Sequence, residues 1–308
     1  MVLQKDPGSA PSSARLWPFT ARFIAAEERL GRRFAKKGKL AAGLYEFLRF
    51  GVKQGWACLF GGLMVALLIG TRLWYPADLP LTRYDFIFLS AVVIQLTLLA
   101  LRLETLDEAK VILLFHVVGT AMEIFKTSVG SWAYPEPSLF RIAGAPLFAG
   151  FMYAAVGSYF ARVWRLFDLR FTRHPPLWAI IGLSAGIYIN FFAHHYVPDF
   201  RLALFALTAL LFGRTTAYFK VWREYRHMPL LLGFMLVALF IWFAENIGTI
   251  TGAWLYPHQA KGWSMVPVSK LGAWFLLMII SYVMIAALNR PQPYAAAKGV
   301  PRSEPVRV

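Results

Sequence analysis

The chain has 308 residues, of which 58% are hydrophobic and only 16% are charged. A soluble domain carries about 25% charged residues, so this composition excludes that class and indicates a polytopic membrane protein. The formal net charge is +16. Because the charges lie in connections and tails, we infer that they orient the protein in the membrane and contact anionic membrane lipids. We therefore expect no nucleic acid partner. A lone cysteine, Cys58, excludes an intrachain disulfide and cysteine-based metal clusters.

The first segment, residues 1–52, is predicted to be a basic cytoplasmic region. Residues 1–16 contain several Pro and Ser and are expected to be disordered. From Arg22 to Lys39, apolar residues alternate with Arg and Lys, which predicts an amphipathic helix on the membrane surface. The alternative is a solvated run of charge before the first span. A cleavable signal peptide is not expected, because this region is too charged.

The region from 53 to 289 is predicted to form the transmembrane domain. A spanning helix needs about 20 mostly apolar residues, and eight segments meet this condition. The predicted fold is therefore all-α, a bundle of eight transmembrane helices. The eight segments lie near 53–73, 84–102, 110–132, 142–163, 176–195, 199–219, 228–252 and 266–288.

The orientation follows from where Lys and Arg occur. Most of them fall in the N-terminal segment, in alternate connections and in the C-terminal tail. The positive-inside rule then places both termini in the cytoplasm of a multi-pass protein of the bacterial inner (plasma) membrane. The tail, residues 290–308, is expected to be disordered and cytoplasmic.

One stretch of thirteen residues occurs twice. Glu123 to Pro135 recurs as Glu245 to Pro257, with Glu, Thr, Gly, Trp, Tyr and Pro matched at a constant offset of 122. This predicts two parallel four-helix repeats, about 53–165 and 170–289, related by a pseudo-twofold axis along the membrane normal. The alternative is that both halves use Trp-Tyr-Pro independently as an interfacial anchor.

The carboxylates of this repeat are the candidate catalytic groups. Glu123 and Glu245 are ionisable residues inside apolar spans, which indicates a functional site. A neutral carboxylic acid there can donate a proton to a substrate or cycle protons during transport. Lys126 lies at the i+3 position to Glu123 and can pair with it, whereas Lys270 can pair with Glu245. The alternative is two structural acids satisfied by hydrogen bonds.

Polar and aromatic residues near the two acids are predicted to line the substrate-binding site. They are Lys126, Thr127, Trp132, Tyr134, Asn190, Asn246, Thr249, Trp254, Tyr256 and Lys270. No metal site is predicted, and the cofactor stays open. The candidates for a metal would be His194, His195, Asp199 and His258. They lack the spacing of membrane di-iron enzymes, so we interpret them as lining an outer vestibule.

Several motifs resemble an uncharacterised bacterial integral-membrane family, the YoaT-like proteins. The resemblance rests on Leu101-Arg-Leu-Glu-Thr-Leu-Asp-Glu108, Glu123-Ile-Phe-Lys126, Asn190-Phe-Phe-Ala-His-His195 and Glu245-Asn-Ile-Gly-Thr249, and it spans about 45–290. It implies a membrane protein of a domain-of-unknown-function family, without an activity.

A shorter likeness links the two repeat copies to membrane lycopene cyclases and carotenoid hydratases. It implies a carboxylic acid, Glu123 or Glu245, that protonates a polyene, with aromatic rings stabilising the cation. The aromatic lining would be Trp132, Tyr134, Trp254 and Tyr256.

Two functions therefore stay open. The first is an intramembrane acid–base enzyme that acts on an apolar lipid or isoprenoid through the paired glutamates. The second is a proton-coupled small-molecule transporter that uses the same glutamates. An enzyme would have a lateral opening to lipid, and a transporter would have a polar path to both faces.

Overall fold

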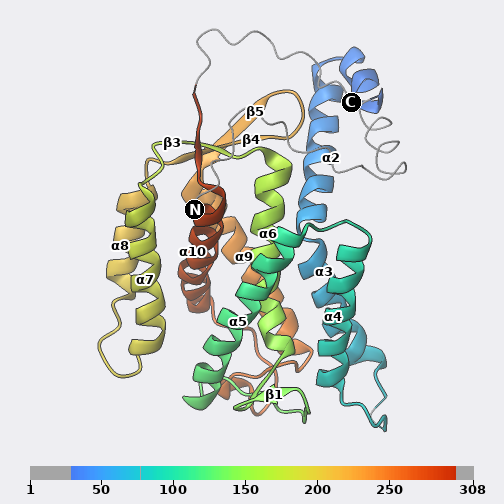
Figure 1. The fold of residues 1–308 in the computed structure, drawn as a ribbon, viewed down its shortest axis with the longest axis vertical. Coiled ribbons are helices and arrows are strands. Elements are labelled where there is room, and N and C mark those ends of the chain that lie inside the picture. The colour runs from blue at the N-terminus through green and yellow to red at the C-terminus, as the bar shows by residue number, and fades with distance from the viewer. Residues whose placement is uncertain (1–28, 77, 296–308) are drawn as a thin grey trace, which may run out of the picture. The chain divides into compact units, whose positions relative to one another are not determined.

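The computed structural model describes residues 29–76 and 78–295 (Figure 1). The chain divides into two units, Met1–Val52 and Lys53–Val308. In the first unit, residues 29–36 are helical, and α2 (Lys39–Ala57) begins shortly after them. The predicted disorder of residues 1–16 and the first part of the predicted amphipathic helix lie outside the described residues.

The second unit consists mainly of helices, and each predicted apolar segment contains one of them. They are α3 (Leu59–Trp74), α4 (Arg83–Ala100), α5 (Leu106–Ser128), α6 (Phe148–Phe167), α7 (Leu177–Ala193), α8 (Arg201–Phe212), α9 (Leu230–Ile250) and α10 (Ser269–Asn289). By length and composition, α4, α5, α9 and α10 can each cross a membrane. A fifth span is possible within the described residues if α2 and α3 together form one broken span.

The sixth predicted span, 199–219, is wrong in its extent. Its helix, α8, has 12 residues. At 1.5 Å per residue this is about 18 Å, too short for a hydrocarbon core of about 30 Å. The remainder of the segment includes strand β4 (Thr216–Lys220), in which Thr216, Tyr218 and Phe219 are residue types that favour strands. The first predicted span is also interrupted, because the helix breaks at Cys58 between α2 and α3.

A four-stranded sheet departs from the all-α prediction. Its order is β5 (Tyr225–Pro229), β4, β3 (Arg170–Thr172) and β6 (Gln292–Pro293). The pairing of β3 with β6 is parallel, and Tyr294 stacks on Tyr218 with ring centroids 3.8 Å apart. The prediction of a disordered tail is therefore wrong for residues 290–295, which these contacts hold in place.

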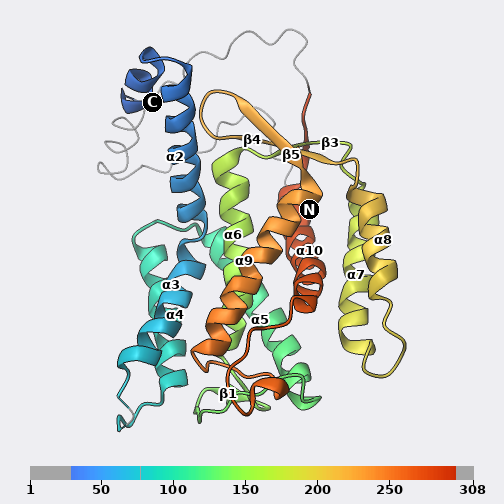
Figure 2. The ribbon, with the colours of Figure 1, turned by 180° about the vertical axis from the view of Figure 1, so that it is seen from behind.

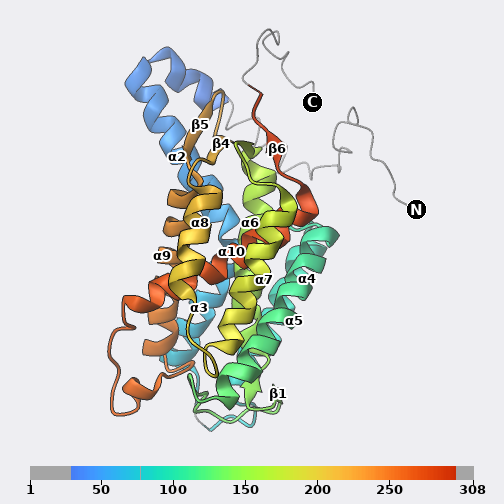
Figure 3. The ribbon, with the colours of Figure 1, turned by 90° about the vertical axis from the view of Figure 1, so that its left-hand side faces the viewer.

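The helices from α3 onward form a central group with a hairpin on either flank. Figures 1 and 2 show α5, α6, α9 and α10 in the middle, α3 and α4 on one side, and α7 and α8 on the other. Figure 3 shows the sheet at one end and the hairpin of β1 (Arg141–Ile142) and β2 (Ala145–Pro146) at the other. The outward faces are apolar, as in exposed Val93, Leu113, Leu202, Leu210 and Phe240.

Candidate functional site

The two copies of the repeated motif end their helices in the same way. After α5, Gly130 has a φ of +71°, and after α9, Gly252 has a φ of +68°. The N–H of Ser131 donates to the carbonyl of Lys126, and that of Ala253 to Gly248, both at 2.9 Å. Glycine takes this left-handed conformation without strain, which lets the chain turn back over the helix end.

The turn brings an indole and a phenol onto each glutamate. In the first copy, Trp132 Nε1 and Tyr134 Oη donate to Oε2 of Glu123 at 2.7 and 2.6 Å. A third donor, Tyr153 Oη from α6, reaches Oε1 at 2.7 Å. Both oxygens of Glu123 are therefore occupied, and its side chain is buried.

In the second copy, both donors converge on one oxygen. Trp254 Nε1 and Tyr256 Oη donate to Oε1 of Glu245 at 2.9 and 2.6 Å. Within the described residues, Oε2 of Glu245 has no recorded hydrogen bond. This oxygen is not fully enclosed by the protein. Glu245 is thus held like Glu123 but has one oxygen free.

The loop tyrosines remain hydrogen-bond donors. Burial, followed by the negative charge of Glu123, raises the pKa of Tyr134 well above its ordinary value. Burial and the charge of Glu245 likewise raise the pKa of Tyr256. Each phenol therefore keeps its proton at neutral pH and stabilises the carboxylate beside it.

The loop after α5, which carries Trp132 and Tyr134, pairs with the loop after α9, which carries Trp254 and Tyr256. The N–H of Ala133 donates to the carbonyl of Leu255, and the N–H of Leu255 donates to the carbonyl of Ala133, both at 2.9 Å. These residues occupy matching places in the two motif copies. The ring of Trp132 also lies edge-on to that of Tyr256, with centroids 6.0 Å apart.

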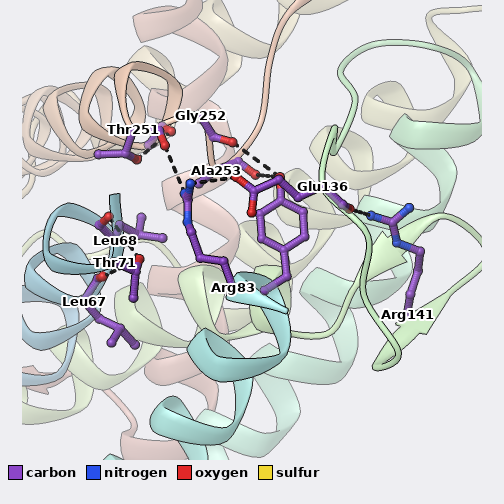
Figure 4. A network of polar contacts seen from close by, with 11 residues as sticks. Leu67, Leu68, Thr71, Arg83, Glu136, Arg141, Thr251, Gly252 and Ala253 are labelled. Carbon is purple, nitrogen blue, oxygen red and sulfur yellow. Dashed lines mark hydrogen bonds and ion pairs between the residues drawn. The ribbon is translucent and has the colours of Figure 1, made fainter. Parts of the chain in front are cut away.

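Residues at the start of α4 fasten both loops from outside (Figure 4). The Arg83 guanidinium, which is nearly buried, donates to Glu136 Oε1 at 2.7 Å and to the carbonyl of Thr251 at 3.0 Å. Tyr84 Oη donates to the carbonyl of Ala253 at 2.9 Å. One helix end thus holds the loop after α5 and the loop after α9 in a single arrangement.

A cavity of about 290 Å³ lies beside the paired loops. Its walls come from α5, α7, α8, α10 and the two loops. The lining residues are Lys126, Ser131, Trp132, Ile187, Asn190, Phe191, His194, His195, Arg201, Tyr256, Ser269, Lys270, Ala273, Trp274, Leu276 and Leu277. Three of these are cations, and none is a carboxylate.

The expected pairing of Lys126 with Glu123 is wrong. Lys126 is 4% exposed, and its Nζ donates to Nε2 of His195 at 2.8 Å and lies 4.2 Å from the centroid of the Phe191 ring. Glu123 already has three donors, so the lysine turns toward the end of α7 instead. Lys270 also makes no ion pair with Glu245, and its Nζ lies 4.6 Å above the ring of Tyr256.

A second, smaller pocket of about 40 Å³ lies next to the first, nearer the sheet end of α5 and α10. The two share Trp274 and Leu277. Apart from Tyr153 and Ser281, the smaller pocket is lined by apolar side chains and one glycine of α5, α6, α9 and α10. The site therefore has a basic part next to the loops and an apolar part deeper in the helix bundle.

Two comparisons with known proteins agree with this chain over most of its length. The family described as "Protein of unknown function (DUF817)" matches residues 46–282. The Uncharacterized protein YoaT of Bacillus subtilis (strain 168) is 41% identical over 253 residues, which cover 82% of this chain and 95% of that protein. The chain belongs to this family. No solved structure matches it significantly.

This result confirms the resemblance to YoaT-like proteins seen in the motifs. Three of the four motifs contribute directly to the site in this member of the DUF817 family. The Glu123 and Glu245 segments carry the two carboxylates, and the Asn190–His195 segment forms one wall of the cavity. Neither family name carries an activity, so the function has to be argued from the geometry.

The predicted lining residues divide into two groups. Lys126, Trp132, Asn190, Tyr256 and Lys270 do line the cavity. The other five do not line the cavity, because they contact neighbouring segments of the same polypeptide instead. Tyr134 and Trp254 hold the glutamates, Asn246 accepts from the N–H of Val266 at 2.9 Å, Thr249 accepts from Trp263 Nε1 at 3.1 Å, and Thr127 packs against Gly144.

The histidines do not form a metal centre in the part of the chain that the structure describes, where no group of three or more His, Cys, Asp or Glu has metal-binding geometry. His194 and His195 line the cavity. His258 instead stacks on the ring of Tyr256. Asp199 accepts from Asn190 at 3.0 Å and pairs with Arg201 at 3.1 Å.

The interpretation of the sequence missed several residues of the site, among them Tyr153, Arg201 and Trp274. Tyr153 was detectable, because the repeat offset matches it with another aromatic residue, Phe275. Arg201 and Trp274 line the cavity. They carried no local signal, since they reach it only through the packing of α7, α8 and α10.

Proposed function

We propose that this protein is a multi-pass protein of the bacterial inner membrane and an acid–base enzyme that acts on an amphipathic lipid or isoprenoid. The observation that carries the proposal is Glu245, which is buried, held by Tyr256 and Trp254, and left with one oxygen free. Tyr256 joins this carboxyl group to the cavity, and the apolar pocket beside it suits the chain of a lipid.

A parallel duplication of four helices is part of the proposal. The reciprocal bonds of Ala133 and Leu255 support it, because matched residues that pair with each other are expected on a twofold axis. The matching left-handed Gly130 and Gly252 support it as well. Both termini would lie in the cytoplasm.

The proposed chemistry uses Glu245 as the group that takes and returns a proton. The hydroxyl of Tyr256 would pass its own proton to Oε1 of Glu245 as it accepts one from the substrate, so that the phenol stays protonated. A proton removed at one carbon and returned at another isomerises the substrate without a co-reactant. Positioned proton transfer of this kind contributes about 10²–10⁴-fold in rate. Glu123, whose oxygens are both occupied, would hold the first loop in place.

The charge of the cavity favours an anionic over a cationic intermediate. Lys126, Lys270 and Arg201 face the same space. Preorganised cations stabilise negative charge that develops in a transition state and disfavour a carbocation. The proposal therefore departs from the polyene protonation that the likeness to carotenoid enzymes implies, and it favours proton abstraction.

Deuterium exchange tests this function even while the substrate is unidentified. The purified protein would be incubated in nanodiscs with a total bacterial lipid extract in D₂O, and the lipids analysed by mass spectrometry. Wild type and Glu123→Gln should place solvent deuterium on carbon in one lipid class, whereas Glu245→Gln and Tyr256→Phe should not. Equal labelling by wild type and Glu245→Gln would contradict the proposal.

A proton-coupled transporter is the second candidate, and the paired loops favour it. Halves related by an axis along the membrane normal are common in transporters that rock around a central site. The test is proton uptake into vesicles driven by a gradient of an organic anion. Uptake that Glu245→Gln abolishes, with no deuterium in any lipid, would favour the transporter over the enzyme.

A further inference from the structure

Lys126 forms no ion pair with a carboxylate among the described residues, and the charge of Asp199 acts on it only from a longer distance. Lys126 is 4% exposed, and no ion pair is recorded for it or for Lys270 in the part of the chain that the structure describes. The partners of Lys126 are the uncharged His195 and the face of Phe191. A buried ammonium without a counter-ion is costly, so such groups normally meet an anion.

The other cations of the cavity point the same way. Lys270 lies over Tyr256, and Arg201 shares its charge with Asp199 alone. Lys270 and Arg201 are near enough for their charges to repel that of Lys126. The three cations outnumber the two carboxylates that act on them, Asp199 and Glu245, and no lining residue is acidic, so the cavity keeps a net positive charge.

Hydrogen-bond donors complete the arrangement. Ser131 and Ser269, which carry hydroxyl groups, line the wall, whereas the amide of Asn190 is already bonded to Asp199 and to the N–H of Phe200. Ser269 is also the first residue of the 21-residue helix α10, so the positive end of that helix dipole adjoins the cavity. Ammonium, guanidinium and hydroxyl groups around one space are the donor set that binds phosphate.

From these contacts we infer that the cavity binds a phosphate-class oxyanion, with Lys126 as its central ligand and Lys270 and Arg201 beside it. The inference rests on the proposed function, which identifies this cavity as the substrate site. It deepens that function by giving the substrate an anionic head group. The adjoining pocket, reached past Trp274 and Leu277, would take the start of an apolar chain.

Equilibrium binding to the full chain in detergent tests this inference. The probes are dioctanoyl phosphatidic acid, dioctanoyl glycerol with the same chains and no phosphate, and inorganic phosphate. We expect phosphatidic acid to bind and dioctanoyl glycerol to bind at least ten-fold more weakly. Binding of inorganic phosphate as tightly as phosphatidic acid would identify a soluble phosphate as the source, and weaker binding a lipid head group.

Two variants and a matched control assign the effect to the cavity. Lys126→Met and the more exposed Lys270→Met should each weaken phosphatidic acid binding at least ten-fold. Lys110→Met removes the same charge from an exposed residue that pairs with Asp107, and it should bind as wild type does. Equal binding of dioctanoyl glycerol, or unchanged binding in both cavity variants, would overturn the inference.

The result is separable from that for the proposed reaction. Glu245 does not line the cavity, so Glu245→Gln should bind phosphatidic acid normally even where it abolishes deuterium exchange. Binding without any exchange in wild type would leave the anion site standing and remove the enzyme. Exchange without anion binding would remove the anion site alone.

Discussion

The two copies of the motif hold their carboxylates with the same two residue types, Trp and Tyr. The carboxylates nevertheless differ in whether one oxygen is left without a hydrogen bond. Glu123 has donors on both oxygens, because Tyr153 adds a third bond. Glu245 has donors on one oxygen only, and the residue that matches Tyr153 is Phe275, which has no hydroxyl group.

A second difference lies one turn further along each helix. Lys126 in the first copy corresponds to Gly248 in the second. Gly248 leaves room for the ring of Trp254, which is buried against it, whereas Lys126 reaches into the cavity. A duplicated framework can therefore use its carboxylate as a structural group in one half and leave the matching carboxylate able to react in the other half.

The largest expected effect is a difference in the free energy of unfolding between variants of Glu123 and variants of Glu245. Glu123→Leu leaves three donors unpaired, of which Tyr134 is buried and Trp132 and Tyr153 are partly buried. Glu245→Leu leaves two buried donors, and each unpaired donor costs about 1–3 kcal/mol. We therefore expect Glu123→Leu to lower the free energy of unfolding by roughly 3 kcal/mol or more, and Glu245→Leu by about two-thirds of that. Thermal denaturation in detergent measures both. A larger loss for Glu245→Leu would reverse the comparison.

Gly248→Ala tests the close packing of the second copy. A Cβ there would lie 2.1 Å from Cη2 of Trp254, so the ring must move away from Glu245. We expect a loss of about 1–3 kcal/mol, as for other overpacked sites. Gly182→Ala in α7 is the control, because its Cβ would meet nothing within 4 Å. That change should stabilise the helix by about 0.5–1 kcal/mol, and equal effects would contradict the packing argument.

Two tyrosine variants separate holding from reaction. Tyr153→Phe and Tyr256→Phe each remove one donor from a glutamate, so each should cost about 1–2 kcal/mol of stability. Of these two tyrosines, Tyr256 lies between Glu245 and the larger cavity, whereas Tyr153 lies between Glu123 and the smaller apolar pocket. Deuterium exchange should therefore persist in Tyr153→Phe and disappear in Tyr256→Phe. Loss of exchange in both, at equal stability, would mean that Glu123 takes part in the reaction.

The smallest effect is a pH dependence at His195. Burial, followed by the charges of Lys126, His194 and Lys270, lowers the pKa of His195, so the neutral form that accepts from Lys126 is favoured. Because the folded-state pKa is lowered, this stability is present above the unfolded value of about 6.5 and is lost as the pH falls. The melting temperature should fall slightly below that pH.

His195→Gln is the control for this dependence. Glutamine keeps an acceptor oxygen but does not titrate, so the slope of melting temperature against pH should flatten. The side chain of His195 is exposed, which keeps the expected change small. An unaltered slope in the variant would assign the dependence to another group.

Much of the site was predictable, because it is encoded locally. The spacing from Glu123 to Trp132 and Tyr134 recurs in the second copy, and one helix end and one turn suffice to bring these groups together. The hydrogen bonds from tyrosine hydroxyls follow from the same pattern. Each of the eight predicted apolar segments likewise contains a helix.

The remainder depended on contacts between distant segments. Thr216 to Lys220 resembles the end of an apolar span, and only its pairing with β3 and β5 makes it a strand. Lys126 was expected beside Glu123 because they are neighbours on one helix. Its true partner, His195, lies 69 residues away and is brought near by the packing of α7. Such choices between partners are not visible in a local pattern.

The difference between the two carboxyl groups can be measured directly by their reactivity. Dicyclohexylcarbodiimide enters membranes and forms a stable adduct with accessible carboxylic acids, which mass spectrometry locates to a residue. The account predicts labelling of Glu245, its loss in Glu245→Gln, and little or none at Glu123, whose two oxygens are engaged by three donors. Equal labelling of the two residues, or labelling mainly at Glu123, would contradict it.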